Sequence, residues 1–270
     1  MHKDWLIPDW PAPSNVRAVF TTRHGGVSNM PYDSMNLGDH VGDAPEHVAA
    51  NRALLQDATG ARAVFLKQVH GNEVLALDAA TPDGGQADAC VTAQRHVACT
   101  IMVADCLPVL LTNEDGTAVA AAHAGWRGLA GDASQGHKGI LASFYESFSA
   151  VAGVQSSQPA IKTIAWLGPC IGPSAFEVGA EVKAAFEAGH ADAGRFFVAK
   201  GGSKYFADLP GLARMRLQAL GITQVYGNDG SAPWCTVSNF SNFFSHRRDA
   251  GPAGNGFGTT GRMAACIWLA

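Results

Sequence analysis

Short apolar runs separated by turn-forming residues dominate the pattern along the chain. The runs at 97–103, 107–111 and 118–122 are rich in Val, Leu, Ile and Ala and are too short for typical helices. The residues NEDG at 113–116 separate the last two runs and favour a tight turn. The pattern therefore predicts two buried strands paired as a β-hairpin.

The rest of the chain alternates strands and helices without regular βαβ spacing. This favours an α+β fold, with mixed β-sheets packed together and flanked by helices, as a single domain over 1–270. A capping Asp43 and a first-turn Pro45 support the start of the first helix, and Gly60 supports its end. The predicted helices span 45–60, 128–149, 178–189 and 208–221. The further predicted strands are 16–22, 63–70, 73–77, 89–92, 161–167, 222–226 and 266–269.

Two stretches predict neither a helix nor a strand. Residues 154–159 are polar and predict a loop. Residues 251–261 are rich in glycine, but they do not connect a strand to a helix, so they are not a dinucleotide-binding loop.

Composition narrows the class of protein. With 47% hydrophobic and 16% charged residues, the 270-residue chain can bury a substantial core. A net charge of −4 gives no field that attracts nucleic acid or a membrane surface. Residues 1–11 lack the features of a secretory signal, and no run approaches the roughly 18 apolar residues of a membrane span. Six cysteines without a C-x-x-C pair suit reduced thiols, so we expect a cytoplasmic protein.

Three side chains are candidate metal ligands. Antiparallel pairing of the predicted hairpin brings Cys106 and His123 to the same end, and His70 ends the predicted strand at 63–70. Each residue alone is more often part of a core than a ligand. The separations of 36 and 17 residues exceed those of structural zinc fingers, and three ligands leave a fourth position open. This pattern is typical of a catalytic zinc site, with Gly71 and Gly125 leaving room for a cleft.

Five motifs carry a family resemblance. In chain order they are LKQVHG, VADCLPVLL, AAHAGWRGL, LGPCIGPSAFEVG and FFSHRRDAGPAG with GRMAACIWLA. Together they resemble the YfiH-like family over nearly the whole chain. Its members go by the names polyphenol oxidase, laccase-domain protein and purine nucleoside phosphorylase. The resemblance implies zinc at His70, Cys106 and His123, with phosphorolysis of adenosine, inosine and methylthioadenosine and deamination of adenosine as a side activity.

The expected partners are therefore a nucleoside and phosphate, both small molecules. For substrate contacts we expect Arg23 and Asn36, from a long loop that also suits a plain solvated surface, and Gln68 from LKQVHG. Arg247 and Arg248 lie beside aromatic residues and suit a phosphate or ribose contact; a lone basic pair is weak evidence for nucleic-acid binding.

Two more residues are catalytic candidates beside Cys106. Arg127 supplies a fixed donor that suits a phosphate oxyanion. Asp105 suits either a hydrogen bond that holds a ligand histidine or a proton transfer, or else it only caps the next turn. We do not expect His24, His40 or His47 to bind metal.

Three other functions remain open. A copper phenol oxidase fits poorly because no His-x-His pair occurs, although two imidazoles and a thiolate also bind copper. A metal-free hydrolase would use Cys106 as nucleophile and His123 as base, and the family's link to cell-wall precursors would supply its substrate. A binding module would close the zinc site with Cys235 or His246. The sequence does not set the oligomeric state.

Overall fold

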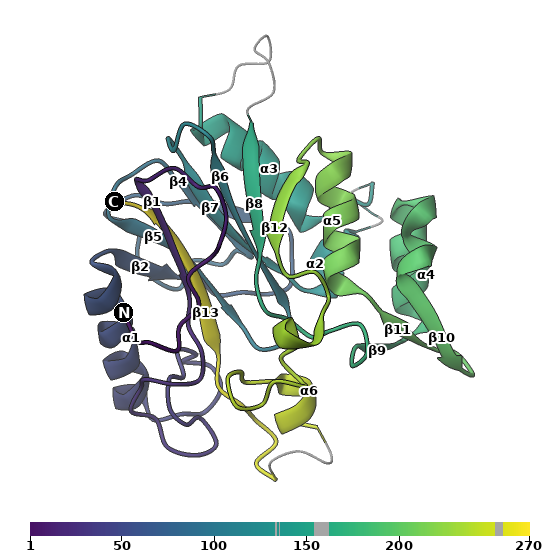
Figure 1. Cartoon of the computed structure of the whole chain (residues 1–270), viewed down its shortest axis with the longest axis horizontal. Helices are drawn as coiled ribbons and strands as arrows, with labels where there is room; N and C mark the ends of the chain where they lie inside the picture. Colours follow the sequence, from purple (N-terminus) through teal and green to yellow (C-terminus); the bar gives the residue numbers. More distant parts are fainter. Residues whose placement is uncertain (133, 135, 154–161, 252–255) are drawn as a thin grey trace.

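The protein is built as four layers, in the order helix, four-stranded sheet, six-stranded sheet, helices (Figure 1). The computed structural model describes residues 1–132, 134, 136–153, 162–251 and 256–270. The predicted loop at 154–159 and most of the glycine-rich stretch therefore lie outside the described residues. The mixed sheets and flanking helices confirm the predicted α+β fold.

The four-stranded sheet has the order β1-β13-β5-β2. All its neighbours are antiparallel except β2 and β5, which are parallel. Helix α1 covers its outer face through Val48 and Leu55. The strands are β1 (Val16–Phe20), β2 (Arg62–Phe65), β5 (Val97–Val103) and β13 (Met263–Leu269), and the helix is α1 (Pro45–Thr59).

The six-stranded sheet has the order β12-β8-β6-β7-β4-β3 and packs on the first sheet through a shared core. The predicted hairpin is confirmed, because β6 and β7 pair antiparallel with Pro108 opposite His123. Leu110 and Trp166 face the inner core with Phe20 of the other sheet. The strands are β3 (Val74–Ala76), β4 (Ala89–Thr92), β6 (Leu107–Asn113), β7 (Val119–Ala124), β8 (Thr163–Leu167) and β12 (Gln224–Gly227).

Helices cover the other face of the six-stranded sheet. The helix predicted over 128–149 is wrong as one element, because the chain forms α2 (Trp126–Ala130) and α3 (Ile140–Val151). Gly131 separates them at φ 83°, a backbone conformation that favours glycine. Phe144 and Phe148 bury α3 against the sheet.

A small three-stranded sheet, which the sequence did not predict, extends this helical side. It has the order β10-β11-β9 and lies beside α4. Val178 belongs to β9 rather than to the predicted helix over 178–189, which begins at Ala180. The elements are β9 (Glu177–Gly179), α4 (Ala180–Gly189), the 3-10 helix η2 (Ala191–Phe196), β10 (Phe197–Gly201) and β11 (Lys204–Ala207).

Of the two helix caps predicted from the sequence, one forms and one does not. Asp208 accepts a hydrogen bond from the Gly211 amide and begins α5 (Leu209–Ala219), as predicted. Asp43 does not cap α1, whose N-cap is Ala44 without a side-chain cap. Two short helices lie between β12 and β13, namely η3 (Ala232–Trp234) and α6 (His246–Asp249).

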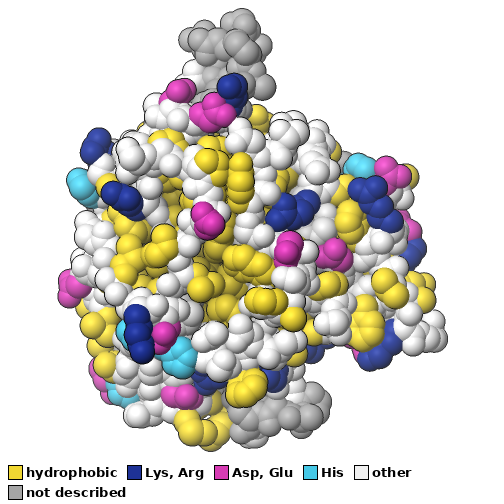
Figure 2. All heavy atoms as spheres, viewed as in Figure 1, with side chains coloured by type: hydrophobic (Ala, Val, Ile, Leu, Met, Phe, Trp, Pro, Cys, Tyr) yellow, Lys and Arg dark blue, Asp and Glu magenta, His cyan; other side chains and the backbone are white. Residues whose placement is uncertain are grey.

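No single-sign field covers the face drawn in Figure 2, where acidic and basic side chains are interspersed. Within the described ranges, no helix has the length and apolar character needed to cross a bilayer.

Candidate metal centre and the cavity beside it

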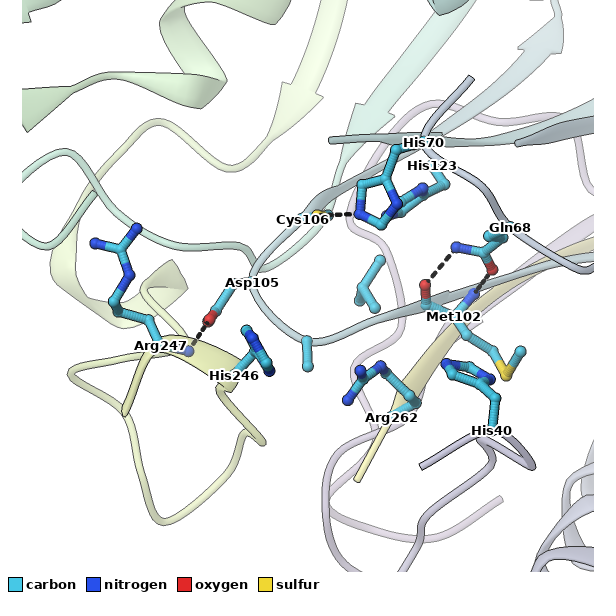
Figure 3. A pocket seen from close by; sticks show the side chains of 12 residues that line it. His40, Gln68, His70, Met102, Asp105, Cys106, His123, His246, Arg247 and Arg262 are labelled. Carbon is cyan, nitrogen blue, oxygen red and sulfur yellow. Dashed lines mark hydrogen bonds between the residues drawn. The ribbon is translucent and has the colours of Figure 1, made fainter. Parts of the chain in front are cut away.

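Three ligand atoms converge at one end of the two sheets, where the chain crosses from β5 to β6 (Figure 3). One donor atom from each of His70, Cys106 and His123 lies within 4.8 Å of the other two. The Cys106 Sγ is 3.8 Å from the His70 Nε2, and the two imidazole rings are nearly perpendicular at 80°. The prediction that these three side chains converge is therefore confirmed.

Each ligand comes from a different piece of the fold. His123 lies in β7, and Cys106 lies in the short crossover that precedes its partner β6. The predicted strand at 63–70 is wrong beyond β2, which ends at Phe65. His70 instead occupies a loop at φ 62°.

Gly125 makes room for the three ligands. A Cβ at this position would lie 2.8 Å from the His70 Cδ2 and 3.2 Å from the Cys106 Sγ. Both distances are tighter than ordinary van der Waals contact, so a side chain would displace a ligand. The glycine expected beside a cleft is therefore confirmed as a steric requirement of the site.

Asp88, which sequence reasoning missed, holds two of the ligands in place. Its carboxylate accepts a hydrogen bond from His123 Nδ1 at 2.8 Å and from the backbone amides of Val69, His70 and Gly71. It is completely buried. Since Asp88 occupies Nδ1, the His123 Nε2 is the nitrogen that faces Cys106. Asp88 immediately precedes β4 and belongs to no recognisable motif. The only signal in the sequence is its place between a turn and a buried strand.

The electrostatics couple Cys106 to His123. Burial raises the pKa of the Cys106 thiol, but the charge and hydrogen bonds of His123 and His70 outweigh it and lower that pKa to about 6. Burial also opposes protonation of His123, but the Cys106 thiolate and Asp88 raise its pKa to about 9. Without a metal ion, the two groups therefore form a thiolate–imidazolium pair near neutral pH.

The donor set fits a divalent metal ion. Two imidazole nitrogens and one thiolate are soft and intermediate ligands that zinc and copper both accept. Ligand atoms on a tetrahedral zinc lie about 3.6 Å apart, close to the 3.8 Å between Cys106 Sγ and His70 Nε2. No fourth His, Cys, Asp or Glu of the described chain joins the group. Cys235 instead accepts hydrogen bonds from Gly172 and Ser238, and His246 lines the cavity.

A cavity of about 280 Å³ opens directly on the three ligands. Its volume lies near the lower end of the range for small-molecule sites, roughly 300–1,000 Å³. Gln68 lines it, although both amide atoms bond the Met102 backbone, so this residue presents its side chain as a wall. The other lining residues are His40, Met102, Val103, Ala104, Asp105, His246, Arg247 and Arg262.

Asp105 does not hold a ligand histidine, which corrects one of its expected roles. Its two carboxylate oxygens accept hydrogen bonds from Thr236 Oγ1 at 2.5 Å and from the Arg247 amide at 2.6 Å. Asp88 performs the histidine-holding role. Asp105 thus ties the start of α6 to the crossover that carries Cys106, and it reaches a distant helix rather than the next turn.

The adjacent Arg247 and Arg248 have different environments. Arg248 donates hydrogen bonds to Asp249 and to the carbonyls of Thr236, Val237 and Phe243, so its guanidinium is used inside the loop. A substrate contact by Arg248 stays a prediction. Arg247 is exposed, lines the cavity and makes one long hydrogen bond, 3.4 Å, to the Ala175 carbonyl.

Arg23 and Asn36 support the first loop instead of lining the cavity. Asn36 is completely buried, and its amide bonds Gly38, Asp43 and the Arg262 backbone. Arg23 bonds Asp33 and the carbonyl of Phe240. Their polar atoms are already used inside the protein, and direct substrate contact by either residue stays a prediction.

Arg127 lies in a second cavity, of about 410 Å³, that meets the first at His70. Its guanidinium is exposed and lies 4.4 Å from the centre of the Trp126 ring. His40 lines the first cavity opposite Cys106. Sequence reasoning missed Arg262 as a cavity residue, because it reads simply as the residue before a buried strand.

The fold and the site together define a class of protein. This is an α+β protein with an open His-Cys-His site between two packed sheets, beside a cavity lined by arginines. The family described as multi-copper polyphenol oxidoreductase laccase matches residues 17–270, and the chain belongs to that family.

Similar proteins carry a different name. The chain is 46% identical over 266 residues to a purine nucleoside phosphorylase of Pseudomonas aeruginosa, PA4543, covering 98% of both chains. It is equally similar, over the same shares, to the purine nucleoside phosphorylase YfiH of Escherichia coli. The crystal structure of Neisseria meningitidis protein NMB0706 is similar with a TM-score of 0.84 and 44% identity over 99% of each chain. These relatives support an enzyme of the phosphorylase kind.

Proposed function

We propose that the protein is a zinc-dependent purine nucleoside phosphorylase that acts on adenosine, inosine and methylthioadenosine, with adenosine deamination as a side activity. The open ligand group of His70, Cys106 and His123 at the floor of the cavity carries the proposal. The names of full-length relatives at 46% identity support the reaction class. The six free cysteines support a cytoplasmic location.

His70, Cys106 and His123 would hold the zinc ion, and Asp88 would keep His123 in the tautomer that ligates. When bound, the ion supplies positive charge that polarises an oxygen atom and lowers the pKa of water. Copper suits the same donors and is the alternative metal. Oxidation of phenols is less supported, because the described residues contain a single ligand group for metal.

In phosphorolysis, a phosphate oxygen forms a bond to the anomeric carbon of ribose as the bond from that carbon to the purine nitrogen breaks. The bonding electrons leave with the purine, which takes up a proton, and the other product is ribose 1-phosphate. Arg247 lines the cavity with an exposed guanidinium that suits charge on phosphate. Asp105 fixes the backbone of Arg247 and thereby positions it. Arg127 and Gln68 remain proposed contacts at the rim and wall of the site.

The direct test measures adenine and ribose 1-phosphate released from adenosine by the purified zinc-loaded protein in phosphate buffer. We expect stoichiometric release of both products, and loss of release in Cys106→Ala. Thr223→Val serves as the unaffected control, because Thr223 is exposed and lies between α5 and β12, outside the cavity. Release of inosine and ammonia in parallel would support deamination. Absence of adenine release at any zinc load would contradict the proposal.

A thiol hydrolase is the second candidate, because Cys106, His123 and Asp88 form a thiolate–imidazole–carboxylate series. Cell-wall precursors would be its substrates. Chelation separates the two functions. Removal of zinc abolishes phosphorolysis but leaves or increases a thiolate-dependent hydrolysis. His70→Ala removes a metal ligand but keeps the Cys106–His123–Asp88 series, so it should reduce phosphorolysis far more than hydrolysis.

A further inference from the structure

Arg262 projects into the cavity from the residue before β13 (Figure 3). Its aliphatic stem packs on Gly38, where an added Cβ would lie 2.7 Å from the Arg262 Cγ. Its Nη1 donates to the carbonyls of Thr260 and Gly261 at 3.0 and 3.2 Å. The side chain is therefore fixed along one edge and at its stem.

The other edge of this guanidinium has no protein partner. Nε and Nη2 form no hydrogen bond to any described residue, and no carboxylate of the described chain lies within ion-pair distance. Arg23, Arg52 and Arg248, in contrast, each pair with an aspartate.

Arg262 is half-buried. A cation that is partly withdrawn from water and has no carboxylate partner is costly unless an anion joins it. Burial lowers the pKa of Arg262, although the charges of Cys106 and Asp105 favour its protonated form. Arginine remains charged at neutral pH in proteins, so the cavity contains a fixed positive charge. The free Nε–Nη2 edge presents two parallel N–H groups, the geometry that binds two oxygens of one oxyanion.

We propose that Arg262 binds the tetrahedral oxyanion substrate, inorganic phosphate, through its free Nε–Nη2 edge, with Arg247 as the exposed second cation of the same cavity. The inference rests on the proposed function, since phosphorolysis requires phosphate beside the sugar. It assigns the fixed contact to Arg262, while Arg247, tied through its backbone amide to Asp105, contributes from an exposed side chain. Phosphate then lies between Arg262 and the metal ligands.

The test titrates inorganic phosphate into the zinc-loaded protein and follows binding by calorimetry, with no nucleoside present. Arg262→Met removes the charge and keeps the length of the stem, and Arg262→Lys keeps the charge but removes the planar fork. We expect about 10- to 100-fold weaker binding in Arg262→Met, because a charge-assisted bidentate contact is lost. Arg262→Lys should lose about tenfold. The matched control is Arg17→Met, an exposed arginine in β1 that does not line the cavity and should bind phosphate normally.

The outcomes separate this inference from the function on which it rests. In steady-state phosphorolysis, Arg262→Lys should raise KM for phosphate more than KM for adenosine. Wild-type phosphate affinity in either folded Arg262 variant, or no binding by the wild-type protein, overturns the assignment. If Arg262→Met does not fold, Arg262→Lys decides. Phosphate binding that depends on Arg262 without any adenine release would leave the assignment standing and reject phosphorolysis.

Discussion

At the scale of single residues, the site depends on one buried carboxylate. Asp88 accepts hydrogen bonds from three consecutive amides around His70, which has a left-handed backbone, and from the ring of His123. One side chain therefore sets the positions of two ligands, one in a loop and one in β7. Residues that orient ligands in this way commonly contribute 10- to 100-fold to metal affinity.

Asp88→Asn should weaken zinc binding by about 10- to 100-fold, because an amide has one acceptor oxygen and cannot satisfy the same donors. Competition with a chromophoric chelator measures the affinity. The exposed Asp57→Asn on α1 provides the control for the same chemical change. Unchanged zinc affinity in folded Asp88→Asn would show that Asp88 does not position the ligands.

The Cys106 thiol should react as a low-pKa cysteine in the metal-free protein. Its pKa is lowered from 9.0 to about 6, so the thiolate predominates above pH 6 and disappears as the pH falls through 6. Alkylation by iodoacetamide, located by mass spectrometry, should therefore show a midpoint near pH 6. The other five cysteines are buried and provide an internal reference. A midpoint near 9 would rule out the coupling to His123.

Gly125→Ala tests the steric requirement directly. The new methyl group would lie against His70 and Cys106 and should displace one of them. Zinc affinity should fall by at least about tenfold, since loss of one ligand bond costs more than 1.4 kcal/mol. Gly136→Ala provides a comparison. Gly136 is exposed and no atom would crowd its added Cβ, so this variant introduces only the backbone strain of a positive φ. Full zinc affinity in Gly125→Ala would contradict the crowding.

At the scale of elements, local pairing was easier to predict than distant contact. The hairpin brings Cys106 and His123 together at its open end, so apolar runs and turn residues were enough to predict their meeting. His70 was a candidate from its place at the end of a predicted strand, and the family resemblance implied the same ligand, although that strand ends five residues earlier. Asp88 depends on contacts across the fold. Arg247 and Arg248 are neighbours in sequence, and only the direction of each side chain on α6 distinguishes them.

The contact between α6 and the crossover from β5 to β6 can be tested directly. Thr236 donates a hydrogen bond to the buried Asp105 carboxylate, which also accepts from the Arg247 amide. Thr236→Val keeps the shape and removes the donor, so the free energy of unfolding should fall by about 1.5–3 kcal/mol. Because α6 carries Arg247, KM for phosphate should rise while zinc content stays at the wild-type level. Chemical denaturation, elemental analysis and kinetics measure these three quantities, with Thr223→Val as the control; a loss of zinc would reject this division of roles.

At the scale of the whole molecule, two packed sheets create the site where the chain crosses between them. His70 follows a strand of one sheet, His123 belongs to the other, and Cys106 lies on the crossover. The α+β class followed from the order of short runs, because those runs are local. The four-layer stacking and the small sheet beside α4 did not, because they depend on which faces pack together.

Removal of metal should abolish adenosine phosphorolysis while the packed sheets keep the fold. Three hydrophobic clusters between and outside the sheets stabilise the chain without the ion. Chelator-treated protein should retain its far-ultraviolet circular dichroism and regain activity when zinc is restored. Unfolding on chelation would instead indicate a structural zinc.

The coordination sphere itself is the most direct measurement. X-ray absorption at the zinc edge of the loaded protein should show one sulfur and two imidazole ligands, completed by a light atom that changes when phosphate or adenosine is added. A sphere with two sulfurs, with no sulfur, or with a fourth protein ligand that substrates never alter would contradict the open three-ligand site.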